Sequence, residues 1–134
     1  TAAVAIPVSN STATADTALN SLPLQRGYYV DTGTPCGSAS IVTLATVRRD
    51  GIGAGRVLNR FKRIEKIDPT TYRVTADEIN NDGGVDGRSA SEYEITGPSS
   101  FRWKNDFGIS TMRFCPQGTL PNPWRTNDIR SLIK

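Results

Sequence analysis

Residues 72–77 read Tyr-Arg-Val-Thr-Ala-Asp, an alternation of apolar and polar side chains that indicates the fold class. A period of two is typical of a β-strand with one buried and one exposed face. A turn precedes the stretch at residues 68–71, where Pro69 takes the second position, which suits its restricted φ angle. A loop rich in Gly, Asp and Asn follows at residues 80–88. The stretch therefore predicts one strand between two reversals of the chain.

Similar strand signals recur on both sides of this stretch, and no long segment shows helical periodicity. The expected strands are residues 27–30, 41–48, 56–67, 72–77, 92–95, 101–104 and 109–115. Such a series predicts an all-β, single-domain antiparallel β-barrel or barrel-like sandwich of about seven to eight strands. At most one short C-terminal helix is expected, in residues 126–133.

Local signals refine these strands. Residues 41–48 are moderately apolar on both faces, which predicts a central strand. Residues 50–55 begin with Asp-Gly, a strong hairpin signal, and so predict the turn of a hairpin. The alternation slips near Arg63 and Ile64, which predicts a β-bulge.

The chain contains two cysteines, Cys36 and Cys115, and no histidine. Their wide separation fits no metal-ligand spacing, and without histidine a zinc site cannot be completed. A disulfide between Cys36 and Cys115 is the first interpretation; two independent buried thiols are the alternative. The disulfide favours a location outside the reducing cytosol, in the periplasm or secreted.

The start of the chain favours the same location. Residues 1–21 are rich in Thr, Ala, Ser and Asn, and Asp16 is their only charged residue. We interpret them as a flexible lead-in left after removal of a signal peptide, or as the start of a shortened chain. The ordered β-rich domain is then expected at residues 22–134. The longest apolar stretch is residues 41–47, far shorter than the roughly 20 residues of a membrane span.

The composition excludes several classes of catalyst. Without histidine the chain cannot form a Ser-His-Asp or Cys-His nucleophile system. No cofactor is expected, and an enzymatic role is not favoured. Glu92 and Glu94 share one face of an expected strand and could act as acid and base on a glycan. Exposed acids on an outer strand face are the alternative.

The loop that begins at Glu78 is a weak calcium candidate. Glu78, Asn80 and Asp82 place oxygen atoms at alternating positions before a glycine, as calcium loops do. Ser89 stands where such a loop needs a bidentate acid, so we expect an Asn/Gly turn and no metal.

Charge is strongly patterned. Residues 48–66 carry seven basic and two acidic side chains, whereas residues 77–94 carry six acidic and one basic. The first block is a candidate surface for a polyanion; pairing between oppositely charged neighbouring strands is the alternative. The candidate polyanion-binding residues are Arg48, Arg49, Arg56, Arg60, Lys62 and Arg63.

Three segments of the chain resemble small uncharacterised periplasmic or secreted proteins of bacteria. They are residues 22–30 (Leu-Pro-Leu-Gln-Arg-Gly-Tyr-Tyr-Val), 34–40 (Thr-Pro-Cys-Gly-Ser-Ala-Ser) and 113–116 (Arg-Phe-Cys-Pro). The resemblance implies a periplasmic location and a β-rich fold, but no activity. It also implies a second cysteine pair near positions 59 and 78, where this chain carries Asn59 and Glu78.

We therefore expect an exported binding module, such as an inhibitor or an envelope-associated ligand-binding protein. Its partner would be a protein, a glycan or a small molecule, and nucleic acid is not expected outside the cell. The alternatives are a carboxylate-based hydrolase of glycans and a polyanion binder that uses residues 48–66.

Overall fold

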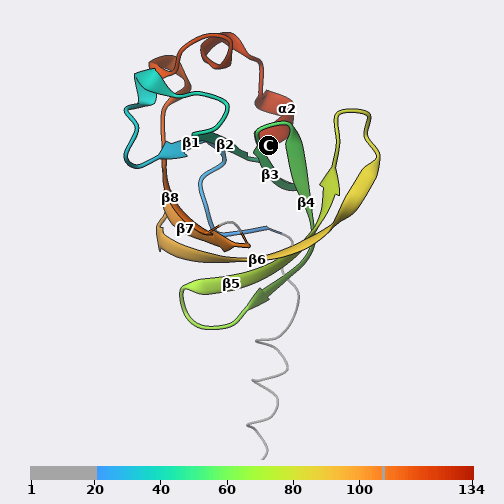
Figure 1. Cartoon of the computed structure of the whole chain (residues 1–134). Helices are drawn as coiled ribbons and strands as arrows, with labels where there is room; N and C mark the ends of the chain where they lie inside the picture. Colours follow the sequence, from blue (N-terminus) through green and yellow to red (C-terminus); the bar gives the residue numbers. More distant parts are fainter. Residues whose placement is uncertain (1–20, 107) are drawn as a thin grey trace, which may run out of the picture.

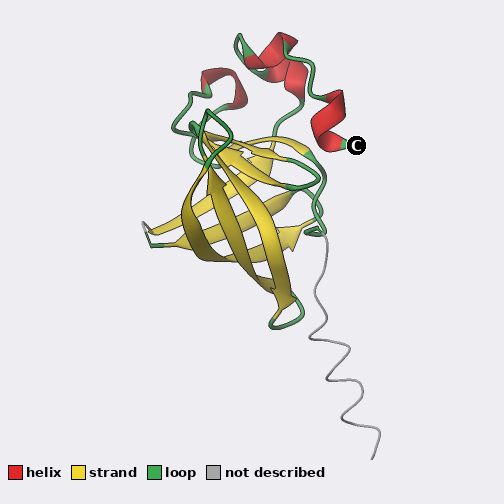
Figure 2. Ribbon diagram, turned by 90° about the vertical axis from the view of Figure 1, so that its right-hand side faces the viewer, coloured by secondary structure: helices red, strands yellow, loops and turns green. Residues whose placement is uncertain are grey.

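The strands close on themselves. In the computed structural model, which describes residues 21–106 and 108–134, each strand pairs antiparallel with the next, and β8 pairs with β1 (Figures 1 and 2). The strands are β1 (Gly27–Asp31), β2 (Leu44–Val47), β3 (Gly51–Ala54), β4 (Val57–Lys66), β5 (Thr71–Ile79), β6 (Val85–Gly97), β7 (Ser100–Asn105) and β8 (Gly108–Phe114). The predicted antiparallel barrel is confirmed, with eight strands.

Helical structure is short and lies outside the barrel. Single 3-10 turns form at η2 (Cys36–Ser38), η3 (Gln117–Thr119) and η4 (Trp124–Thr126), and α2 (Arg130–Ile133) is the predicted C-terminal helix. Asp128 Oδ1 accepts a hydrogen bond from Arg130 N (3.1 Å) at the start of α2. The segment from η3 to α2, residues 117–134, is called the C-terminal segment below.

The observed strands differ from the predicted ones in three places. Residues 41–43 form a turn before β2, and Val42 is 86% exposed, because only the second half of the apolar stretch finds strand partners. Residues 51–54 form the strand β3 between two tight turns, so one predicted hairpin is in fact two. β6 begins at Val85, so the β5–β6 loop is shorter than predicted. The predicted bulge is confirmed between Phe61 and Arg63.

Two hydrophobic clusters lie on opposite sides of the barrel wall. The cluster inside the barrel includes Tyr29, Ile64, Tyr93 and Phe101. Leu22 is buried with them, and Gln25 N donates a hydrogen bond to Pro98 O (2.9 Å) in the β6–β7 turn. The segment before β1 therefore closes the end of the barrel at which β1 begins.

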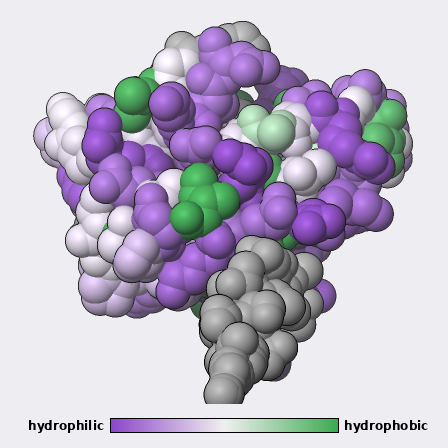
Figure 3. Space-filling view, turned by 90° about the horizontal axis from the view of Figure 1, so that it is seen from below, coloured by the Kyte–Doolittle hydropathy of each residue, from purple (hydrophilic) through white to green (hydrophobic). Residues whose placement is uncertain are grey.

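The second cluster lies between the outer face of β1 and the C-terminal segment. It includes Tyr28, Leu120 and Ile129, with Trp124 packed against it. β1 is consequently buried on both faces, which explains why residues 27–30 read as a continuous apolar and aromatic run. The surface seen from below, in contrast, is mostly hydrophilic, with hydrophobic residues standing apart from one another (Figure 3).

The predicted disulfide is confirmed. Cys36 and Cys115 are bonded (S–S 2.05 Å), which joins η2 to the end of β8 beside the second cluster. The bond is compatible with an extracellular location. None of the described helices is long and apolar enough to cross a membrane.

The strand register also bears on the second cysteine pair near positions 59 and 78, which the resemblance to small bacterial proteins implies. Asn59 on β4 lies directly opposite Glu78 on β5. Residues opposite one another on neighbouring strands point to the same face of the sheet, so cysteines at these two positions would face each other. The predicted lead-in, residues 1–21, lies outside the described residues except for Ser21.

Candidate functional site

The inner face of the barrel changes character along its length. On β6 the inward positions run from Tyr93 in the core through Ser91 to Ser89. On β5 they run from Tyr72 through Ala76 to Glu78, opposite Asn59. One end of the interior is therefore apolar and the other polar, and we call the polar end the barrel mouth.

A hollow of about 380 Å³ opens at the barrel mouth. Small inward side chains explain it, because Ser89 lies directly opposite Ala76 and neither residue can fill the centre of an eight-stranded barrel. The residues that line the hollow are Ala54, Val57, Asn59, Glu78, Ser89, Ala90, Ser91, Trp103, Asn105 and Asp106.

Trp103 gives this hollow an aromatic wall. Its ring stacks on Tyr93 with a centroid separation of 5.7 Å and an interplanar angle of 16°. Its indole Nε1–H is buried and has no hydrogen-bond partner among the described residues. A buried donor without an acceptor costs free energy, so this atom favours a ligand or water that supplies one. Burial of Tyr93 beneath it raises the pKa of that phenol far above its usual value.

The barrel mouth carries acidic but no basic side chains. Glu78 and Asp106 are its two carboxylates, and none of the described lining residues is Lys or Arg. Ser89 Oγ donates to Asn59 Oδ1 across the hollow (3.5 Å), so a hydroxyl and an amide lie side by side. This arrangement can hydrogen-bond a polar molecule and disfavours an anion.

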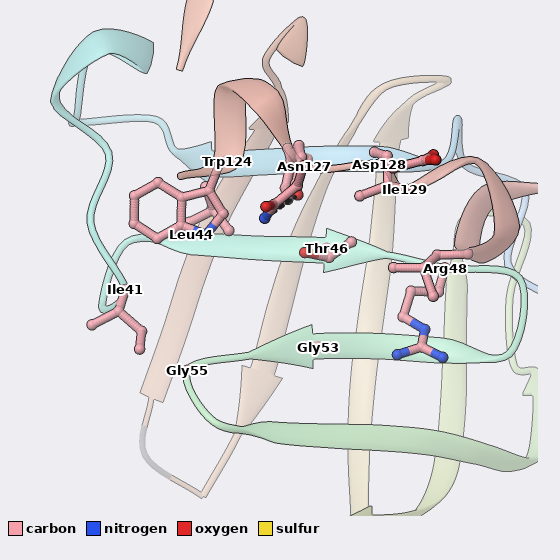
Figure 4. Close-up of a pocket in the computed structure, with 12 residues that line it drawn as sticks. Ile41, Leu44, Thr46, Arg48, Gly53, Gly55, Trp124, Asn127, Asp128 and Ile129 are labelled. Atoms are coloured by element: carbon pink, nitrogen blue, oxygen red, sulfur yellow. Dashed lines mark hydrogen bonds between the residues drawn. The ribbon is translucent and has the colours of Figure 1, made fainter. Parts of the chain in front are cut away.

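A second hollow of about 370 Å³ lies outside the barrel, between β2, β3 and the C-terminal segment. Figure 4 shows Gly53 and Thr46 on the sheet, Trp124 beyond one end of it and Arg48 at the other. We call this hollow the outer groove.

The candidate polyanion-binding residues are largely engaged in other contacts. Arg48 pairs with Asp50 (3.1 Å), Lys62 with Asp77 (3.8 Å) and Arg63 with Glu65 (3.2 Å). The guanidinium of Arg49 donates to Ser131 O, which ties the β2–β3 turn to the C-terminal segment. Arg56 and Arg60 lie exposed on and near β4. The structure thus pairs much of the basic block with nearby acids rather than presenting it as one surface.

The calcium candidates do not converge. Glu78 points into the barrel mouth, whereas Asp82 is exposed in the β5–β6 turn. Asn80 Oδ1 accepts hydrogen bonds from Asp82 N (2.9 Å) and Gly84 N (3.0 Å), so the asparagine stabilises the turn itself. Among the described residues no group of three acids, histidines or cysteines could hold a metal ion.

Glu92 and Glu94 lie on the outer face of β6, on either side of the inward-facing Tyr93. Glu92 pairs with Arg73 (3.8 Å) and Glu94 with Arg102 (2.9 Å). Both carboxylates are partly exposed and act as cross-strand ion-pair partners. Neither of them lines the barrel mouth.

Most of the barrel-mouth residues were not recognisable as site residues from the sequence. Ser89 directly follows the predicted loop at residues 80–88 and precedes the strand expected at residues 92–95, so the sequence assigned it to no strand and gave no orientation for its side chain. Trp103 was placed only within an expected strand, residues 101–104. Alternation on β5 does place Glu78 on the same face as Val74 and Ala76, and an acid in an otherwise apolar row was the available signal.

Comparison of the chain with protein-family models, curated proteins and solved structures finds no significant match.

Proposed function

We propose that this protein is an exported, non-enzymatic binding module that holds a small polar ligand in its barrel mouth. The observation that carries the proposal is the set of inward-facing polar side chains around a hollow of about 380 Å³. Ligand pockets in proteins commonly measure about 300–1,000 Å³ and combine apolar walls with a few placed polar groups. The disulfide supports export.

The chemistry of the lining indicates the class of ligand. Asn59 and Ser89 offer amide and hydroxyl groups, and Trp103 offers an aromatic wall. Glu78 and Asp106 make the site acidic. A small neutral or positively charged molecule with hydroxyl groups, such as a monosaccharide or an amino alcohol, matches these groups, whereas an anion would be repelled.

The proposal is tested with a variant whose larger side chain occupies the hollow at the barrel mouth. Ser89→Leu places a large side chain opposite Ala76, inside the barrel mouth. Thr75→Leu is the matched control, because Thr75 lies on the outer face of β5 between Val74 and Ala76. In a Trp124→Phe background Trp103 is the only tryptophan, so its emission reports on the barrel mouth.

Monosaccharides and amino alcohols are titrated against these variants by tryptophan emission and calorimetry. We expect at least one probe to bind the unfilled protein and the control alike, with affinity at least about tenfold lower in Ser89→Leu. The proposal is wrong if no probe binds, if Ser89→Leu binds equally well, or if mass spectrometry finds the probe converted to a product.

A further inference from the structure

The floor of the outer groove contains a glycine, Gly53, that neither its neighbouring atoms nor its backbone conformation requires. Gly53 stands in the middle of β3, paired with Thr46 on β2 and Leu58 on β4. Glycine inside a strand is unfavourable, and in proteins it often marks a place where a ligand or another backbone approaches closely. A Cβ atom at Gly53 would meet nothing within 4 Å, and the residue does not have the positive φ that demands glycine. The bare floor therefore leaves room for something outside the chain.

The groove cannot take up an additional strand. β3 is already paired with β2 on one side and with β4 on the other, and the barrel is closed. The strands that form the floor of the groove therefore have no free hydrogen-bonding edge. An extended peptide that adds to a sheet needs such an edge. A ligand in this groove must instead be recognised by side chains.

Those side chains combine an aromatic end with polar walls. Trp124 stands at one end, next to Ile41, which is 46% exposed (Figure 4). Thr46 offers a hydroxyl from the floor, and Asn127 offers an amide from the C-terminal segment. An indole provides a flat apolar surface beside groups that can hydrogen-bond.

The charges of the groove are balanced within the protein. Arg48 at the far end pairs with Asp50 (3.1 Å), and Asp128 on the C-terminal segment pairs with Arg130 (2.8 Å). Since each of these charges already has a partner within the protein, a charged ligand would gain little electrostatic binding energy in the groove. A neutral ligand needs no such contribution.

We propose that the outer groove binds a neutral oligosaccharide, with one sugar ring against Trp124 and the next lying over Gly53. A sugar ring has an apolar C–H face that suits an indole and hydroxyl edges that suit Thr46, Asn127 and Arg48. The bare floor lets the flat ring approach the sheet closely. The outer groove and the barrel mouth lie on opposite sides of the barrel wall, so this proposal does not depend on the first.

The test uses Gly53→Leu, which covers the floor with a side chain that the structure has room for. Trp124→Ala removes the aromatic end, and Thr75→Leu is the control for an added side chain on the outer surface. A Trp103→Phe background leaves Trp124 as the only tryptophan. The probes are neutral oligosaccharides of glucose, mannose and N-acetylglucosamine. Their binding is followed by Trp124 emission and by calorimetry, and the Trp124→Ala variant, which lacks this fluorophore, is measured by calorimetry alone.

We expect one of these oligosaccharides to change the emission of Trp124. Its affinity should fall at least about tenfold in Gly53→Leu and in Trp124→Ala, and stay unchanged in Thr75→Leu and Ser89→Leu. Thermal unfolding shows whether each variant is folded. If Gly53→Leu does not fold, the affinity of Trp124→Ala alone tests the proposal. The proposal is overturned if none of the oligosaccharides binds at millimolar concentration, or if both groove variants bind them normally.

Discussion

Two glycines on β3 show how one residue type serves opposite purposes. A Cβ atom at Gly51 would press against Asn59 O, far inside van der Waals contact, and would lie 3.0 Å from Arg60 Cα. Gly51 is therefore needed for close approach of β3 and β4. At Gly53, two positions later, a Cβ atom would meet no other atom within 4 Å. The first glycine lets β3 and β4 approach closely, and the second leaves the outer groove open.

Alanine scanning of these glycines should give effects of opposite sign. We expect Gly53→Ala to raise the free energy of unfolding by about 0.5–1 kcal/mol, because it removes the strand cost of glycine without a clash. Gly51→Ala should lower it by about 1–3 kcal/mol, because β4 must move. Urea denaturation measures both values. Equal effects at the two positions would contradict this difference.

At the scale of elements, the seam between β1 and β8 closes the barrel. The two strands pair at only three positions, fewer than any other neighbours except β2 and β3. The guanidinium of Arg113 on β8 reinforces this seam by donating to Val30 O (3.0 Å), Asp31 O (2.9 Å) and Thr34 O (2.8 Å). The Cys36–Cys115 disulfide adds a covalent bond on the outside of the same seam.

Removing the disulfide should therefore weaken the barrel without abolishing it. The bond closes a loop between residues 79 positions apart. Closing a loop of that length restricts the unfolded chain, and the double variant Cys36→Ala/Cys115→Ala should lose about 3–5 kcal/mol of unfolding free energy. Guanidinium denaturation measures the loss, and circular dichroism should show that β-structure is retained. An unchanged denaturation midpoint would show that the bond contributes little.

At the scale of the whole molecule, two buried tyrosines couple stability to alkaline pH. Burial raises the pKa of Tyr29 to about 12, and its hydroxyl donates to Gln25 O (2.6 Å) in the segment that closes the barrel. Burial raises the pKa of Tyr93 even further. In the unfolded chain both phenols have the usual tyrosine pKa of about 10, so above that pH the unfolded state binds fewer protons than the folded state.

The stability of the protein should consequently be independent of these tyrosines below about pH 9 and fall as the pH rises from about 10 to 12. Urea denaturation at several pH values measures the slope. The Tyr29→Phe/Tyr93→Phe variant is the control, since it lacks both ionisations and should show a shallower decline. If the free energy of unfolding falls equally with pH in both proteins, titrating groups other than Tyr29 and Tyr93 cause the loss of stability.

The strands were predictable to the extent that one face of each is buried. Alternation identified β5 and the aromatic run identified β1, because inner and outer positions differ in polarity there. Prediction failed at β3, where both outward positions are glycine, and at the start of β6, where most residues after Val85 are small or polar on both faces. Small inward side chains leave no hydrophobic pattern, and these are the residues that open the barrel mouth.

The amino-acid sequence alone was enough to predict an antiparallel β-fold, its bulge, its short terminal helix and the single disulfide pairing that two cysteines allow. These properties depend on local periodicity, turn residues and the number of possible pairings. The three-dimensional structure was needed to show that the barrel closes, that Glu78 and Trp103 face one hollow, and that the C-terminal segment forms a groove over Gly53. Each of these depends on strand register and on contacts between residues far apart in the chain, which side-chain alternation does not encode.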